Sequence, residues 1–138
     1  MNKLVCLSLA FVLMASSLVG CVFGCTEIGC DNGLTILFLS PEGDPIEPSA
    51  GRLIAGSEVF EFDCAAGGGE GVDCFGEEAF FFITEPTVSL ELVNQAGEIV
   101  HTHDFAGIDY EVFQPNAFGC GSECNNATVT AVIEAPNP

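Results

Sequence analysis

The sequence predicts an all-β fold: an immunoglobulin-like antiparallel β-sandwich of about seven strands, stapled by disulfides. Three observations predict it. Apolar and polar residues alternate at period two in several short segments, which is the pattern of half-buried strands. Clusters of glycine, proline and asparagine separate these segments at close spacing. The 138 residues include eight cysteines, enough for a disulfide framework in a small exported domain.

The expected strands follow one another with short turns between them. Residues 34–39 (LTILFL) form a short apolar run, and the proline-rich PEGDPIEP ends it. Residues 52–55 and 58–64 flank a turn at Gly56 and Ser57. The remaining expected strands are 80–84, 88–92, 98–105, 110–113 and 128–134. The apolar positions that repeat at period two, or lie inside the short apolar runs, form the expected core. They are Leu34, Ile36, Phe60, Phe62, Phe81, Val88, Leu90, Leu92, Val129 and Ile133.

Residues 1–20 have the three parts of a secretory signal peptide. Lys3 supplies a positive charge, residues 4–14 are apolar apart from Ser8, and small residues follow up to Gly20. The apolar run is too short for a membrane-spanning helix, which needs roughly 20 residues. The expected organisation is therefore a signal at 1–20 and a single β-sandwich domain at 21–138.

The end of this signal resembles a bacterial lipobox, in the sequence Leu18-Val19-Gly20-Cys21. The resemblance implies that the Cys21 sulfur is bonded to diacylglycerol, that the signal is cut before Cys21, and that the new N-terminus carries a fatty acid such as palmitate. Two or three acyl chains anchor a protein stably, whereas one chain does so only marginally. Val22 follows the cysteine where a retained lipoprotein would have aspartate, which implies export to the outer membrane.

The other cysteines are expected to form disulfides. Cys6 leaves with the signal, and lipid on Cys21 leaves an even set of six in an oxidising compartment. Cys64 and Cys74 enclose the flexible AAGGGEGVD segment, so we expect them to pair with each other. A zinc site is less favoured, because the cysteine spacings differ from those of zinc knuckles. Either the other four join the beginning of the chain to its end or they form two local bridges; they are Cys25, Cys30, Cys120 and Cys124.

The charge balance excludes several partners. All 20 acidic residues lie after residue 20, against Arg52 alone, so the side chains there carry a charge of about −19. A chain without a basic patch does not bind nucleic acid or anionic lipid headgroups by charge. We interpret the acidity as a solvated surface. Divalent-cation binding is the alternative, although no ligand loop is recognisable.

Few residues offer catalytic chemistry. His101 and His103 lie two apart on an expected strand and so share one face, which is the geometry of a two-histidine metal pair. Asp104 or Asp109 could complete such a site, but zinc needs three or four ligands, and we expect no metal and no cofactor. The serines show no GxSxG motif. We expect no enzymatic activity.

Both ends of the expected domain resemble one family. The segments CTEIGCDNGLTI (25–36) and YEVFQPNAFGCGSECNNATV (110–129) are similar to the ends of small, uncharacterised lipoproteins from myxobacteria and related bacteria. Those proteins open with C-T-x-x-G-C-x-D/N-G-L and close on P-N-G followed by C-x-x-x-C; Ala117 stands here at the glycine position. The resemblance implies a lipoprotein with a β-sandwich and implies no activity.

Together these observations predict a lipid-anchored protein of the bacterial cell envelope that acts as a structural or binding module. It would contact the membrane through its lipid and another envelope protein or a glycan through its loops. The loops most suited to recognition are 41–50, 65–73 and 114–121. Phe113 and Phe118 lie on either side of Pro115 at the last of these loops, and these aromatic rings either anchor a partner or cap the core.

Overall fold

A computed structural model of the chain describes residues 29–116, 121 and 123–134. The predicted signal at 1–20 lies outside these residues, as do Cys21, Cys25, Ala117, Phe118 and Cys120. The chain divides into two compact units, one of Met1–Gly29 with Gln114–Ser122, the other of Cys30–Phe113 with Glu123–Pro138. Every strand belongs to the second unit, which is described below. The predicted domain boundary at residue 21 stays a prediction.

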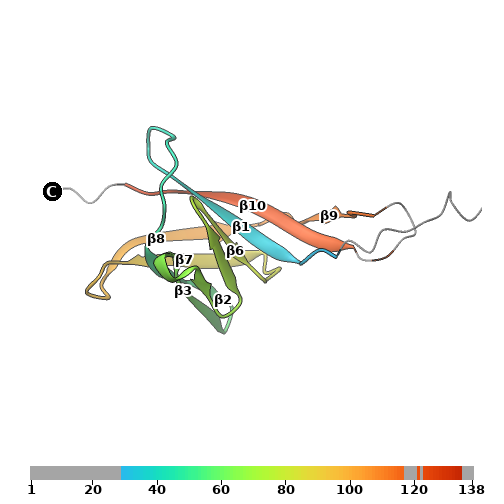
Figure 1. Ribbon diagram of the computed structural model, residues 1–138, viewed down its shortest axis with the longest axis horizontal. Helices are drawn as coiled ribbons and strands as arrows, with labels where there is room; N and C mark the ends of the chain where they lie inside the picture. Colours follow the sequence, from blue (N-terminus) through green and yellow to red (C-terminus); the bar gives the residue numbers. More distant parts are fainter. Residues whose placement is uncertain (1–28, 117–120, 122, 135–138) are drawn as a thin grey trace, which may run out of the picture. The chain divides into compact units, whose positions relative to one another are not determined.

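The described part of the chain is almost entirely β-structure, as predicted (Figure 1). A short 3₁₀ helix, η1 at Cys64–Ala66, is the exception. The strands are β1 (Gly33–Leu39), β2 (Ala50–Ala55), β3 (Glu58–Asp63), β4 (Gly68–Gly69), β5 (Val72–Phe75), β6 (Glu78–Phe81), β7 (Thr87–Val93), β8 (Ile99–Ala106), β9 (Glu111–Phe113) and β10 (Cys124–Val132).

Hydrogen bonding joins these ten strands into one sheet with the order β8-β7-β2-β3-β4-β5-β6-β1-β10-β9. All neighbours are antiparallel except β1 and β10, which pair in parallel from Gly33↔Asn126 to Leu39↔Val132. The expected sheet was antiparallel throughout with about seven strands, so this pair and the strand number differ from the prediction. The immunoglobulin-like division into two sheets stays a prediction, since the observed pairing is continuous.

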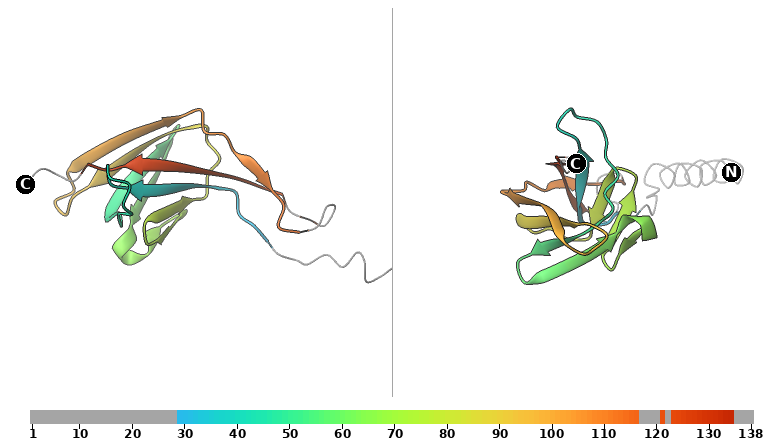
Figure 2. Two further views of the ribbon diagram at one scale, coloured as in Figure 1. Left: turned by 90° about the horizontal axis from the view of Figure 1, so that it is seen from above. Right: turned by 90° about the vertical axis from the view of Figure 1, so that its left-hand side faces the viewer.

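The two edge strands of the sheet, β8 and β9, are consecutive in the chain and separated only by residues 107–110. One extended segment therefore pairs first with β7 and then with β10. The strands lie around a common centre, as the end-on view in Figure 2 shows. Backbone and side-chain hydrogen bonds hold the connection: the Ile108 N–H donates to the Pro86 carbonyl at 2.9 Å, and the Tyr110 hydroxyl donates to the Glu85 carbonyl at 3.0 Å.

The inward face of this curved sheet forms one hydrophobic core. Alternation at period two places these side chains inside, as on Leu34, Ile36 and Phe38 of β1. Seven of the ten predicted core residues are buried, and Phe60, Val129 and Ile133 pack against the core while remaining partly exposed. Buried residues that the prediction did not include are Phe38, Leu53, Ala55, Val72, Ala79, Ile83, Phe105, Cys124, Ala127 and Ala131.

Two disulfides join cysteines within the described part of the chain. Cys64 and Cys74 are joined as predicted, with 5.3 Å between their Cα atoms. Cys30 is joined to Cys124 with 5.9 Å between the Cα atoms and 94 residues between them in sequence. Of the alternatives left open for these cysteines, the structure therefore shows a bond from the beginning of the chain to its last strand.

Candidate functional site

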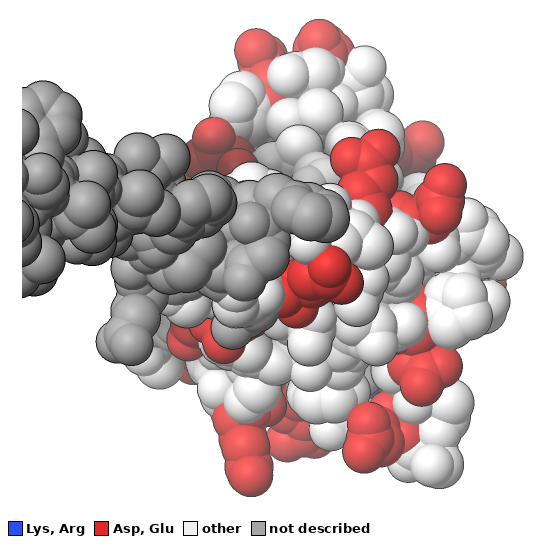
Figure 3. All heavy atoms as spheres, turned by 90° about the vertical axis from the view of Figure 1, so that its right-hand side faces the viewer, with Lys and Arg blue, Asp and Glu red and all other residues white. Residues whose placement is uncertain are grey.

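Acidic side chains are spread over the surface and do not gather at one place on the face that Figure 3 shows. Arg52 is the only lysine or arginine among the described residues, and it forms an ion pair with Glu91 on the neighbouring strand β7. On its other side Arg52 lies opposite Glu61 of β3. The single cation of the sheet is thus held between two carboxylate-bearing strands.

The two histidines share one face of β8, as predicted, and this is the inward face of the sheet. His101 is opposite Leu92 and His103 is opposite Leu90, both of which are buried. The histidine rings stack with 6.2 Å between centroids, and His103 packs on Phe105 at 4.4 Å. The His101 Nε2 atom is buried, and no described residue forms a hydrogen bond with it.

Among the residues that the structure describes, no third metal ligand lies beside the two histidines. Asp104 lies on the opposite face of the strand, because successive residues of a strand alternate. Within the described ranges there is no group of three or more histidine, cysteine, aspartate or glutamate side chains that could hold a metal ion.

Two of the three predicted recognition loops are described in full. Residues 41–50 include a turn closed by hydrogen bonds from the Ser40 N–H to the Asp44 carbonyl and from the Gly43 N–H to the Ser40 carbonyl. The segment 65–73 is more regular than expected, because β4 and the start of β5 lie within it. In 114–121 only residues 114–116 and 121 are described, so Phe118 lies outside the described residues.

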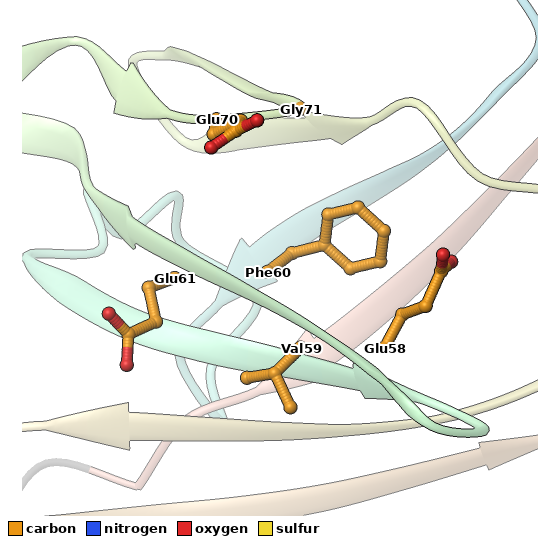
Figure 4. A pocket seen from close by; sticks show the side chains of 6 residues that line it. All are labelled: Glu58, Val59, Phe60, Glu61, Glu70 and Gly71. Atoms are coloured by element: carbon orange, nitrogen blue, oxygen red, sulfur yellow. The ribbon is translucent and has the colours of Figure 1, made fainter.

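A hollow of about 810 Å³ lies beside β3 and the turn between β4 and β5. Figure 4 shows its lining side chains, Glu58, Val59, Phe60, Glu61, Glu70 and Gly71. Glu58 and Glu61 are three residues apart on a strand, so they project from opposite faces and do not converge in the figure. Three carboxylates therefore line the hollow without forming a cation cage.

Aromatic side chains cover part of the outer face near β5 and β6. Phe80 and Phe82 contact each other edge to face at 5.0 Å, and the Phe80 ring lies over Gly33, where a Cβ atom would be only 2.1 Å from the ring. Phe75, which is 64% exposed, extends this surface on β5. Position 33 therefore requires glycine, because the Phe80 ring on the outer face occupies the space that a side chain would need.

A second hollow lies where β9 stops pairing with β10, and we call it the fork groove. Its volume is about 580 Å³. The residues that line it are Asp109, Glu111, Val112, Phe113, Asn126, Ala127 and Thr128. Val112 and Phe113 are 61% and 53% exposed, so β9 presents apolar side chains to solvent.

The floor of the fork groove is rigidly supported. The Cys30–Cys124 disulfide joins the start of β10 to the residues before β1, and the Asn125 N–H donates to the Asn32 side-chain oxygen at 2.8 Å. Asn126 pairs with Glu111 on one side and with Gly33 on the other. Among the residues that the structure describes, none forms a hydrogen bond with its buried side-chain oxygen. One residue that lines the groove thus carries an unsatisfied acceptor.

Beyond Asn126, β10 continues to Val132 with β1 on one side, and no strand of the described part pairs with its other side. The open edge has the sequence ATVTAV, in which Thr128, Thr130 and Val132 are exposed. The sequence does contain a signal for this open edge, an uncharged run rich in β-branched residues. The run could not be recognised as an open edge, however, because periodicity does not reveal which strands pair with each side of β10.

No helix in the part of the chain that the structure describes is long and apolar enough to cross a bilayer.

The fork groove and the open edge of β10 are the features best suited to binding, because an unpaired strand edge, an unsatisfied acceptor and exposed apolar side chains meet there. Comparison with protein-family models, curated proteins and solved structures finds no significant match to the chain.

Proposed function

We propose that the protein is a lipid-anchored component of the bacterial cell envelope, attached through Cys21 to the outer membrane, and that it works by binding or as a structural module without catalysis. The observation that carries the proposal is the pair of disulfides, Cys30–Cys124 and Cys64–Cys74. Structural disulfides persist in oxidising compartments outside the cytoplasm, where a lipobox-bearing chain would be sent.

The position of the first disulfide suits a short tether. Cys30 follows Cys21 by nine residues in the sequence, and its bond to Cys124 ties this point to the last strand. A pull on an anchor at Cys21 would thus be borne by a covalent link between the residues before β1 and the neighbouring last strand, β10. The domain would lie close to the lipid surface, since nine extended residues span at most roughly 30 Å.

The non-catalytic part of the proposal is supported by the surroundings of the histidines. His101 and His103 pack against each other and against Phe105 on the inward face of β8. We therefore interpret them as packing residues. Hydrolytic or transfer activity that disappears on changing His101 or His103 would overturn this interpretation.

Metabolic labelling with an alkyne analogue of palmitate tests the anchor. The wild-type protein should carry the label and remain in the membrane fraction, and Cys21→Ser should lose both properties. Cys25→Ser is the matched control, because it removes a nearby cysteine without touching the lipobox, and it should stay labelled. A label that persists in Cys21→Ser would contradict the proposal.

Calorimetric titration with Ca²⁺ and Zn²⁺ separates this function from the divalent-cation alternative. A binding module of the proposed kind gives no saturable heat at physiological salt, because its carboxylates are dispersed on the face that Figure 3 shows and the described residues contain no group of three or more metal ligands. Saturable binding of either ion at a defined stoichiometry would favour the alternative.

A further inference from the structure

We propose that the open edge of β10, together with the fork groove, binds an extended basic polypeptide segment of another envelope protein by β-strand addition. This inference rests on the proposed binding function and names the partner class. In strand addition, main-chain hydrogen bonds to an exposed edge give affinity, and neighbouring side-chain sites give specificity.

The open edge of β10 lacks the features that usually protect the edge of a sheet. Natural sheets protect their edges with lysine, proline, bulges or a covering element. The segment 127–132 has no charged residue, no proline and no glycine, and no described strand covers it. It is about 20 Å long at the usual rise per residue, enough for a partner segment of roughly six residues.

An unsatisfied acceptor lies at the point where β9 stops pairing with β10. Asn126 is the last residue of β10 that pairs with β9, and no described residue donates a hydrogen bond to its buried side-chain oxygen. Buried polar groups are normally hydrogen-bonded, and an unpaired one is unfavourable. Because Asn126 lines the fork groove, a segment bound in the groove would lie close to the residue that carries this acceptor.

The surroundings of the fork groove are negatively charged. Asp109 and Glu111 border the fork groove, and Arg52, the only lysine or arginine among the described residues, is paired with Glu91 on β7. A second copy of this chain would bring the same carboxylates and a strongly negative total charge to the interface. A segment rich in lysine or arginine would instead be attracted, with Val112 and Phe113 available to its apolar side chains.

The test uses the full mature protein in detergent micelles and a fluorescein-labelled peptide, KVTVKVTK, with fluorescence anisotropy as the readout. The peptide should bind saturably. The charge-reversed peptide EVTVEVTE and the proline-interrupted peptide KVTPKVTK should bind at least about tenfold more weakly, because the first is repelled and the second cannot form the ladder. Equal binding of all three would overturn the proposal.

Two matched variants locate the site. Thr130→Lys puts a charge on the open edge and should weaken binding about tenfold or more. Thr102→Lys makes the same change at an exposed threonine of the other edge strand, β8, and should leave the affinity unchanged. If Thr102→Lys weakens binding and Thr130→Lys does not, the peptide occupies the other edge and the assignment to β10 is wrong.

A second pair of variants separates the fork groove from general acidity. Asp109→Asn with Glu111→Gln should weaken binding about threefold or more and reduce its salt dependence. Glu58→Gln with Glu70→Gln removes equal charge from exposed positions on β3 and after β4, strands that β5, β6 and β1 separate from β10 in the sheet, and should have little effect. Equal weakening by both pairs would show diffuse attraction and contradict the proposal.

Hydrogen exchange keeps the proposal testable even if a variant folds poorly. In the wild-type protein, adding KVTVKVTK should slow amide exchange within 127–132, and binding without such protection would contradict strand addition. Concentration-dependent dimerisation lost in Thr130→Lys would mean that a second copy occupies the edge, which also contradicts it. Palmitate labelling of Cys21 is independent of these outcomes. If the peptide fails to bind, the proposed lipid anchor still stands, and if Cys21 carries no label, the proposed binding at the edge of β10 still stands.

Discussion

At the residue scale, Tyr110 fixes the crossing between the two ends of the sheet. It is the only tyrosine of the chain, and its hydroxyl donates to the Glu85 carbonyl. Burial, together with the negative charge of Glu85, raises the pKa of Tyr110 above its ordinary value of 10.0. The neutral phenol is therefore the form that the folded state favours.

This pKa shift has a consequence for stability. Because the folded-state pKa is raised, the associated stability is fully present below pH 10, the unfolded value, and is lost as pH rises through the folded value. Absorbance titration of the phenol should give a higher midpoint in the native protein than in urea. A native midpoint at or below the unfolded one would contradict the described environment.

Replacement of Tyr110 tests the hydrogen bond itself. Tyr110→Phe keeps the ring and removes the donor to Glu85, so we expect a loss of about 1 kcal/mol in the free energy of unfolding at neutral pH. Urea denaturation measures it. The variant should also lose the part of the alkaline destabilisation that comes from Tyr110, and a variant with unchanged stability and unchanged alkaline behaviour would contradict this role.

At the scale of elements, the two-residue strand β4 depends on glycine. A Cβ atom on Gly69 would lie 2.1 Å from the Glu61 carbonyl oxygen of β3, a backbone atom that cannot move aside independently. Gly68 has a positive φ of 131° and would bring a Cβ atom 2.2 Å from the Val72 carbonyl oxygen. Only glycine lets the backbones of β3, β4 and β5 approach this closely.

Gly69→Ala should therefore destabilise the protein by roughly 1–3 kcal/mol, the usual range for overpacking. Gly29→Ala is the matched control, since a Cβ atom there meets nothing within 4 Å, and it should be close to neutral. Chemical denaturation of both variants measures the difference. Equal stabilities would show that β3 and β4 are not packed as described.

The same region shows why part of the fold could not be predicted from the sequence. The AAGGGEGVD segment was expected to be a loop, because glycine is disfavoured in strands. It holds β4 and the start of β5 because close backbone approach requires glycine there. The core on Leu34, Ile36, Phe62 and Leu90 was predictable, since alternation at period two reports which face is buried.

The sequence pattern could not predict which strands pair over long distances in the chain. The parallel pair β1–β10 joins strands from opposite ends of the chain, and alternation says which face is buried without saying which strand lies beside which. The open edge at 127–132 and the unpaired oxygen of Asn126 follow from that pairing. The candidate site was therefore not predictable, although its exposed Phe113 was singled out.

The two disulfides should differ in their effect. In the chain-entropy model, closing a loop of 10 residues contributes about 2.7 kcal/mol, and closing one of 94 residues contributes about 4.7 kcal/mol. Removing Cys30–Cys124 by a double change to alanine should thus lower stability more than removing Cys64–Cys74. Thermal and chemical unfolding of the two double variants measures this order, and the reverse order would contradict the stapling role of Cys30–Cys124.

At the scale of the whole molecule, the acidic surface and the single arginine make the folded protein self-repelling at low salt. The stapled sheet tolerates this repulsion because covalent links oppose expansion of the chain. A protein of this charge is poorly suited to adsorb on anionic lipid, so a covalent lipid is the physically reasonable anchor. The same charge attracts basic segments to the open edge of β10.

Mass spectrometry of the N-terminal peptide of the protein purified from membranes tests the lipid anchor. We expect the mature chain to begin at Cys21 and this residue to carry diacylglycerol and an acylated amino group, with Cys30 still linked to Cys124. A mature chain that begins elsewhere, or an unmodified Cys21 in the membrane-derived protein, would contradict it.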